Sequence, residues 1–141
     1  MSHQINVGVV GCGYWGPNLV RNLRSIPECD LKLMCDLNPQ RLKHLKSLYP
    51  EVEGHSEFDH LLNGAGLDAI VIATPVKSHH KLAKASLLAG KHTFIEKPMA
   101  ASVEECEELV QIAKQQGVVL MIGHTFLYSA PVRKIKEVVT A

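Results

Sequence analysis

Glu96, Lys97 and Pro98 place a carboxylate and an ammonium group directly after the apolar pair Phe94 and Ile95. Proline keeps the residue before it out of the helical region, so the backbone of Lys97 is extended and its side chain can be aimed. A lysine that ends a strand is usually a solvated surface group. Beside a bound cofactor, however, it can hydrogen-bond a reacting oxygen and stabilise its charge. We therefore expect Lys97 to be catalytic if a cofactor binds at this edge.

A glycine pattern near the N-terminus supplies the candidate cofactor site. The sequence GCGYWG holds Gly11, Gly13 and Gly16, follows the apolar run Ile5–Gly11, and precedes a helix-period segment. Such a pattern alone is often an ordinary turn, but Asp36 lies twenty residues after Gly16, as dinucleotide-binding sites require. The first glycine makes the tight turn, the second admits the pyrophosphate, and the third lets the helix approach the strand.

Asp36 bears on which dinucleotide binds. A carboxylate at the end of the second strand can accept hydrogen bonds from the adenosine ribose diol and would repel a 2′-phosphate. NAD(H) is therefore expected, and NADP(H) is the less favoured cofactor. Arg41, one helical turn further on, is a basic group that qualifies this choice.

Further polar residues end the later strands. Thr74 and Pro75 close the most apolar strand and suit a wall against the cofactor ribose, although an ordinary turn has the same composition. His79 and His80 begin the next helix, and one of them faces the crevice by position. His124 lies at the end of the last expected strand.

Short apolar runs alternate with helix-period segments along the whole chain. Strands are expected at residues 5–11, 30–36, 51–55, 67–74, 92–96 and 118–125, and helices at 17–26, 38–48, 57–63, 78–90, 102–117 and 131–139. Three local signals mark helix ends: Asn38 as an N-cap, Ser78 as a second N-cap, and a Ser102–Glu105 capping box. The helix after Ser102 is expected to turn Val103, Cys106, Val110 and Ala113 inward and to stop at Gly117.

This alternation predicts an α/β fold, a doubly wound Rossmann sheet of about six parallel strands. Ligands on such sheets bind outside the carboxyl ends of the strands, which is where the residues above collect. The 141 residues suit one domain, with 46% hydrophobic and 21% charged residues.

Composition excludes several classes of function. The net charge of +1 gives no footprint for nucleic acid or a membrane surface, and no apolar run is long enough to span a bilayer. The four cysteines form no CxxC pair, so we expect reduced thiols in the cytoplasm and no metal site.

The strand-end motifs, taken together, resemble one family. GCGYWG, Asp36, ATP followed by His79, EKP and GH occur in the order seen in the N-terminal domain of the Gfo/Idh/MocA oxidoreductases. GYWGPNLVRN and GHTFLYSAPVRKIKE look most like the members that act on nucleotide sugars, such as the UDP-N-acetylglucosamine 3-dehydrogenases.

The resemblance implies roles for individual residues. Lys97 would hydrogen-bond the reacting oxygen while hydride moves between a sugar carbinol and nicotinamide. Cofactor contacts would come from the glycine loop, from the ends of strands two and four, and from the last two strands: Gly11, Gly13, Tyr14, Trp15, Gly16, Asp36, Thr74, Pro75, His79, Glu96, Lys97 and His124.

The resemblance also implies a second domain that this chain does not contain. Family members add a strand-rich domain that carries the substrate pocket and the oligomer contacts, whereas residues 1–141 correspond to the dinucleotide-binding domain. We expect a sugar or nucleotide sugar as substrate, a homo-oligomer for the full-length form, and little turnover by this chain alone. The apolar residues Val132, Ile135 and Val138 are candidates for self-association.

Two other functions stay open on the sequence. The chain could be a nucleotide-binding or interaction module that does no chemistry. A methyltransferase also combines a glycine loop with a strand-two acid, although Gly16 three residues after Gly13 and the EKP triplet argue against it.

Overall fold

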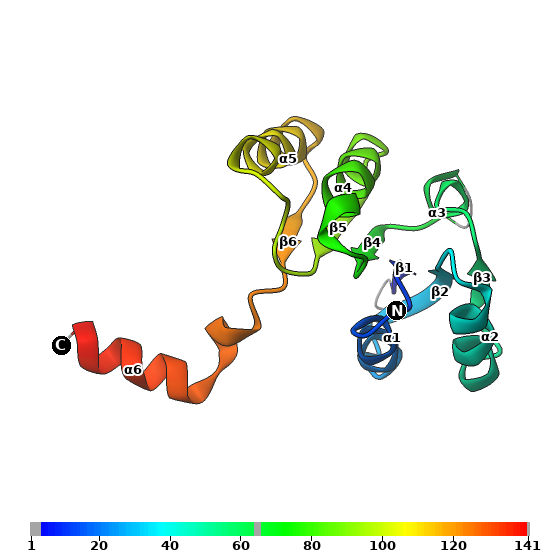
Figure 1. Cartoon of the computed structure of the whole chain (residues 1–141), viewed down its shortest axis with the longest axis horizontal. Coiled ribbons are helices and arrows are strands. Elements are labelled where there is room, and N and C mark those ends of the chain that lie inside the picture. The colour runs from blue at the N-terminus through cyan, green and yellow to red at the C-terminus, as the bar shows by residue number, and fades with distance from the viewer. Residues whose placement is uncertain (1–3, 64–65, 141) are drawn as a thin grey trace.

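Six parallel strands form the centre of the computed structural model, which describes residues 4–63 and 66–140 (Figure 1). The strands are β1 (Ile5–Val10), β2 (Cys29–Cys35), β3 (Glu53–His55), β4 (Ala69–Ile72), β5 (His92–Ile95) and β6 (Leu120–Ile122). Their order across the sheet is β3-β2-β1-β4-β5-β6. The chain winds outward from β1 to one edge and then from β4 to the other, which confirms the predicted doubly wound sheet.

Helices cover both faces of the sheet. Helices α1 (Gly16–Arg24) and α2 (Pro39–Leu48) lie on one face, and α3 (Asp59–Asn63), α4 (His79–Leu88) and α5 (Val103–Gln116) lie on the other (Figure 1). Two apolar clusters follow, because neighbouring residues of a strand point to opposite faces: Val9 packs in the α1–α2 cluster and Val10 in the α4–α5 cluster. Burial on both faces explains why β4 is apolar throughout and why the second half of β1 is apolar.

The helix-end signals are mostly confirmed. The Asn38 side chain accepts hydrogen bonds from the backbone N–H groups of Gln40 and Arg41, so it caps α2. The Ser102 hydroxyl accepts from the N–H of Glu105, but the Glu105 carboxylate takes the N–H of Ala101 rather than that of Ser102. Gly117 adopts φ 66°, the left-handed conformation that ends α5.

The predicted inward face of α5 is wrong at two positions. Val103 is 67% exposed and Val110 is 42% exposed, whereas Leu109, Ile112 and Ala113 are buried. Ala113 lies both on the predicted stripe and on a neighbouring stripe that contains Leu109 and Ile112. The neighbouring stripe carries the larger aliphatic side chains, and it is the one that faces the sheet. The exposed stripe forms a shallow apolar groove along the outer side of α5.

The last helix, α6 (Ala130–Thr140), projects from the body of the molecule after the 3-10 turn η2 (Thr125–Tyr128) (Figure 1). No residue of α6 is buried, and Ile135 and Val138 are 63% and 67% exposed. The apolar face expected here is therefore open. In the part of the chain that the structure describes, no helix combines the length and the apolar character needed to cross a bilayer.

Candidate functional site

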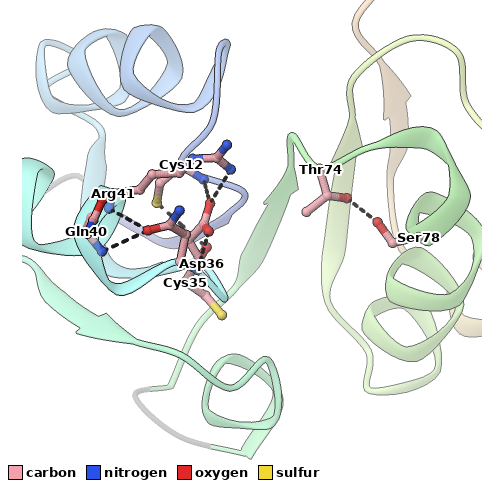
Figure 2. Close-up of polar contacts among 8 residues, drawn as sticks. Cys12, Cys35, Asp36, Gln40, Arg41, Thr74 and Ser78 are labelled. Carbon is pink, nitrogen blue, oxygen red and sulfur yellow. Dashed lines mark hydrogen bonds and ion pairs between the residues drawn. The ribbon is translucent and has the colours of Figure 1, made fainter.

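A cleft of about 1130 Å³ opens at the carboxyl ends of β1, β2 and β4. The glycine loop and the turn after β2 form one side, and the segment after β4 forms the other. Figure 2 shows Asp36 and its neighbours on the first side and Thr74 with Ser78 on the second. Seven of the predicted cofactor residues line the cleft: Gly11, Gly13, Tyr14, Trp15, Asp36, Thr74 and Pro75. Its volume exceeds that of typical small-molecule pockets, about 300–1,000 Å³, and so suits a long ligand.

The three glycines of the loop differ in whether the surrounding structure leaves room for a side chain. Gly11 has φ 97°, and a Cβ there would lie 2.6 Å from the backbone carbonyl of Ala73. A Cβ at Gly16 would lie 2.1 Å from the carbonyl oxygen of Gly11, so α1 can start here only without a side chain. A Cβ at Gly13 would approach nothing nearer than a guanidinium nitrogen of the Arg41 side chain, 3.5 Å away. Gly13 is therefore not required by packing, and it faces the cleft.

The glycine loop also offers free hydrogen-bond donors. Within residues 4–63 and 66–140, no hydrogen bond from the N–H groups of Gly13, Tyr14 and Trp15 is found. Trp15 occupies the N-cap position of α1, and the first turn of this helix holds no acidic residue. Free N–H groups at a positive helix end bind anions such as phosphate.

Asp36 is committed to the loops around it. One carboxylate oxygen accepts the N–H of Cys12 at 2.7 Å, and the other accepts the N–H of Asn38 at 2.7 Å. Arg41 lies 3.7 Å from the oxygen that Cys12 contacts. The side chain is only 8% exposed. Asp36 therefore fixes the glycine loop against the end of β2, a role that the sequence prediction did not include.

The two residues next to this carboxylate, Cys12 through its N–H group and Cys35 through the chain, carry buried thiols. Burial raises the pKa of the Cys12 thiol to about 12, and the charge of Asp36 contributes to the shift. Burial likewise raises the pKa of the Cys35 thiol to about 11. Since the thiolate is the reactive form, neither group is suited to nucleophilic or metal chemistry at neutral pH.

The wall opposite Asp36 is held by Ser78. Its hydroxyl lies 2.8 Å from the Thr74 hydroxyl and 2.8 Å from the Pro75 carbonyl oxygen. Ser78 therefore occupies the N-cap position of α4 but makes no side-chain cap bond, contrary to the sequence prediction, because its hydroxyl turns back to the strand end. Figure 2 shows the Thr74–Ser78 contact.

The two histidines at the start of α4 have structural partners. His79 is 1% exposed, and its two ring nitrogens lie 2.6 Å from the Thr74 carbonyl oxygen and 2.8 Å from the Pro98 carbonyl oxygen. It thereby ties the end of β4 to the turn after β5. The ring of His80 instead contacts Glu108 of α5 at 2.6 Å, outside the cleft lining.

The Glu96–Lys97–Pro98 turn follows β5, directly beside the end of β4. The Lys97–Pro98 peptide bond is cis, one of the two isomers open to it. Glu96 is 8% exposed and packs against Gly123, where a Cβ would lie 3.2 Å from the carboxyl group. Lys97 and His124 are exposed at the same edge of the sheet, outside the lining of the cleft.

Several cleft residues escaped the sequence prediction. Lys81 and Leu82 of α4 line the cleft together with Ser78, and Phe58 reaches it from the segment before α3. The helical spacing of Ser78, Lys81 and Leu82 places them on one face, which was the available signal. The sequence held no signal that Phe58 lines the cleft, because its place there depends on how the short β3 strand joins the sheet.

The charges of the cleft favour an anion. Among its described lining residues, Asp36 is the one carboxylate, against the basic side chains of Arg41 and Lys81. A glycine cradle with free N–H groups, a strand-two carboxylate and a surplus of positive charge define an NAD-binding Rossmann domain.

Comparison with known proteins gives the family. Residues 5–124 match the family described as "Oxidoreductase family, NAD-binding Rossmann fold". The chain belongs to this family, the Gfo/Idh/MocA oxidoreductases.

Three similar proteins illustrate the relationship. The uncharacterized oxidoreductase YrbE of Bacillus subtilis is 31% identical over 139 residues, which cover 99% of this chain and 41% of YrbE. The structure of GenD2, from gentamicin A biosynthesis, in complex with NAD is 28% identical with a TM-score of 0.87, covering 92% of this chain and 37% of GenD2. The scyllo-inositol dehydrogenase of Lactobacillus casei is 26% identical with a TM-score of 0.88, covering 99% of this chain and 42% of that protein. The chain thus spans about two fifths of the length of these relatives.

Proposed function

We propose that this chain is the NAD(H)-binding part of an oxidoreductase that acts on the CH–OH group of a sugar or nucleotide sugar. The carrying observation is the common edge of the sheet: the cleft lies at the ends of β1, β2 and β4, and Lys97 lies in the turn that follows the neighbouring strand β5. The similarity to a scyllo-inositol dehydrogenase and to the NAD complex of GenD2 supports this choice.

The residues of the cleft fit a dinucleotide. A Cβ at Gly13 would project into the space that the pyrophosphate needs, and the N–H groups of Gly13 and Tyr14 would hold its oxygens. Asp36 would lie at the adenosine ribose, while Thr74 and Pro75 would line the opposite wall. When bound, the dinucleotide supplies nicotinamide as hydride acceptor or donor.

The residues at the ends of β5 and β6 would serve the reacting end of the ligand. Lys97 would hydrogen-bond the substrate oxygen and stabilise its charge as the hydroxyl proton leaves. Glu96 and His124 would lie beside the nicotinamide. His79 would act as a positioning residue, because it joins the Lys97–Pro98 turn to the cleft wall through Pro98 and Thr74.

The substrate pocket would lie in the part of the relatives' length that this chain does not span. In that full-length form we expect a second, strand-rich domain to close over Lys97 and to make homo-oligomer contacts. The exposed apolar face of α6 is consistent with such a neighbour. We also propose a cytoplasmic location, because the four cysteines form no CxxC pair and match no disulfide framework in the sequence.

Binding is tested by the fluorescence of Trp15, the one tryptophan of the chain, which is 47% exposed at the cleft. NADH should quench it saturably, and S-adenosylmethionine should not displace NADH. Displacement by S-adenosylmethionine would favour a methyltransferase, and a folded chain that binds no dinucleotide would overturn the proposal.

Chemistry is tested separately in the full-length protein with myo-inositol and UDP-N-acetylglucosamine as substrates. Lys97→Met should keep NADH affinity and lose hydride transfer by about 10²-fold or more, the contribution typical of a positioned proton-transfer group. Turnover unchanged in Lys97→Met would remove Lys97 from the mechanism. No turnover with a broad panel of sugars would favour the non-catalytic module.

A further inference from the structure

An uncovered apolar stripe runs along the outer side of α5. Val103, Cys106 and Val110 line the shallow groove there, at positions i, i+3 and i+7 of the helix. This spacing is typical of a helix that packs lengthwise against a second helix. Val103 and Val110 are exposed, so nothing in the described part of the chain covers this stripe. It therefore has the form of one half of a helix pair.

The same spacing recurs on α6. Val132, Ile135 and Val139 stand at positions i, i+3 and i+7, and all three are exposed. Seven residues of helix span about 10.5 Å, so the outer valines are equally far apart on the two helices. Figure 1 shows α6 directed away from α5, so α6 does not occupy the groove of its own chain. A matching α6 is therefore available to the groove from another copy.

Opposite charges stand beside the two stripes. Helix α5 holds four glutamates and one lysine, whereas α6 holds three basic residues and one glutamate. Glu107 follows Val103 by four residues, and Lys136 follows Val132 by four, so the two groups hold equivalent positions. Both side chains are exposed, and within residues 4–63 and 66–140 no ion pair of either is found. Charges at such flanking positions decide the partner and the direction of paired helices.

We propose that α6 of one copy of this chain docks antiparallel in the α5 groove of a second copy, and that the exchange in both directions forms a symmetric dimer. Flanking positions on the same side of the two stripes face each other only when the helices run in opposite directions. The antiparallel pair therefore brings Lys136 of one copy to Glu107 of the other.

The same alignment matches the remaining side chains. Val139 packs beside Val103, and Val132 packs beside Val110 at the other end of the groove. Ile135 lies between them and meets Cys106. The basic groove residue Lys114 lies level with Ser129, before the start of α6, and so away from the basic residues of that helix.

The exchange has to be reciprocal because a single helix contact is small. Specific interfaces bury about 1,200–2,000 Å² in total, and two symmetric contacts bury twice the area of one. The inference goes beyond the proposed function and does not depend on dinucleotide binding. A second domain joined after α6 would compete for the same face of this helix, so the dimer is a property of residues 1–141.

Sedimentation velocity of this chain tests the dimer. The wild type should show a monomer–dimer equilibrium at concentrations up to about 1 mM, the weak end of specific affinities. Val110→Asp in the groove and Ile135→Asp on α6 should each weaken the dimer about tenfold or more, because each places a charge in an apolar contact. Circular dichroism checks that each variant is folded.

A charge exchange tests the antiparallel alignment. Glu107→Lys and Lys136→Glu should each weaken the dimer about two- to thirtyfold, since two exposed ion pairs are lost and each contributes about 1.4- to fivefold. The double variant should return to within about threefold of the wild type, because the two charges have changed places. Lys43→Glu on α2 is the matched control, since Lys43 is an exposed helical lysine outside the groove, and it should leave the dimer unchanged.

A disulfide trap tests the contact itself. In Ile135→Cys, the introduced thiol of one copy should lie opposite Cys106 of the other. Oxidised glutathione should then link two chains, as seen on a non-reducing gel. Adding Cys106→Ser to this variant should abolish the linked dimer.

Four results would overturn the inference: a wild type that is monomeric at all concentrations, no recovery in the charge-exchanged double variant, a linked dimer that survives Cys106→Ser, or a disulfide formed within one chain. The third would show that α6 contacts α6, and the fourth would place α6 in its own groove. None of them bears on the proposed function, because neither helix lines the dinucleotide cleft.

Discussion

Gly13 and Gly16 belong to one motif, yet an alanine should have opposite effects at the two positions. At Gly16 the added Cβ would lie 2.1 Å from the carbonyl oxygen of Gly11 and 3.0 Å from its carbonyl carbon. Both atoms are backbone, so α1 must move away from β1. Overpacking of this kind costs about 1–3 kcal/mol or more, and the better helix propensity of alanine returns about 1 kcal/mol. Because the 2.1 Å contact is with a backbone atom, we take the upper end of the overpacking range, about 3 kcal/mol, and expect a net loss of about 2 kcal/mol in the free energy of unfolding.

At Gly13 the added Cβ would meet only the flexible end of Arg41, at 3.5 Å. Restriction of the unfolded chain stabilises such a variant by about 0.4–1 kcal/mol. The methyl group would instead obstruct the pyrophosphate. A steric cost of about 1–3 kcal/mol on the complex corresponds to roughly five- to 150-fold weaker NADH binding.

Thermal unfolding by circular dichroism and NADH titration separate these effects. Gly16→Ala should lower the melting temperature by about 5–10 °C, whereas Gly13→Ala should melt at or above the wild-type temperature and bind poorly. Gly117→Ala is the control for backbone strain alone, because Gly117 has φ 66° and a Cβ there would meet no atom within 4 Å. The reasoning is refuted if Gly16→Ala is as stable as the wild type, or if Gly13→Ala binds NADH normally.

Three further outcomes are expected. His79→Ala should destabilise the domain and, in the full-length protein, lower hydride transfer more than NADH affinity, since it frees the turn that carries Lys97; unchanged turnover would contradict this. The folded-state pKa values of the Cys12 and Cys35 thiols, about 12 and about 11, lie above the ordinary value of 9.0. The two buried thiols therefore contribute fully to stability below pH 9.0, and this contribution is lost as the pH rises from 9.0 toward 12. Alkaline unfolding curves of Cys→Ala variants should therefore flatten, and an unchanged slope would count against buried thiols. Ile135→Asp on the open face of α6 should reduce self-association of this chain in sedimentation velocity, and a wild type that is monomeric at all concentrations would contradict that expectation.

The sequence predicted the sheet and the cleft because their signals are local. The glycine loop, the apolar strands and the Asn38 cap each depend on a few neighbouring residues. The errors concern contacts between segments distant in sequence. The helical spacing of Val103 and Val110 predicted that they face the sheet. In the structure both are exposed, and the stripe that contains Leu109 packs on the sheet instead.

The structural roles of His79 and Asp36 could not be predicted from the sequence either, because they depend on contacts that form only in the folded chain. His79 could be placed near the crevice, but its bond to Pro98, nineteen residues away, depends on the folded arrangement of β4 and β5. Asp36 was expected to serve the ribose, and its two backbone partners became visible only once the loops were assembled. Such residues hold a site together, and a sequence motif does not distinguish them from residues that touch a ligand.

The central claim is that NAD(H) binds between the glycine loop and the end of β4. The most direct measurement is the change in amide NMR shifts of the chain on titration with NAD+. The account predicts saturable shifts at Gly13, Tyr14 and Thr74, with none along α6. Saturation without shifts at the glycine loop, or shifts centred on α6 or on the groove of α5, would contradict it.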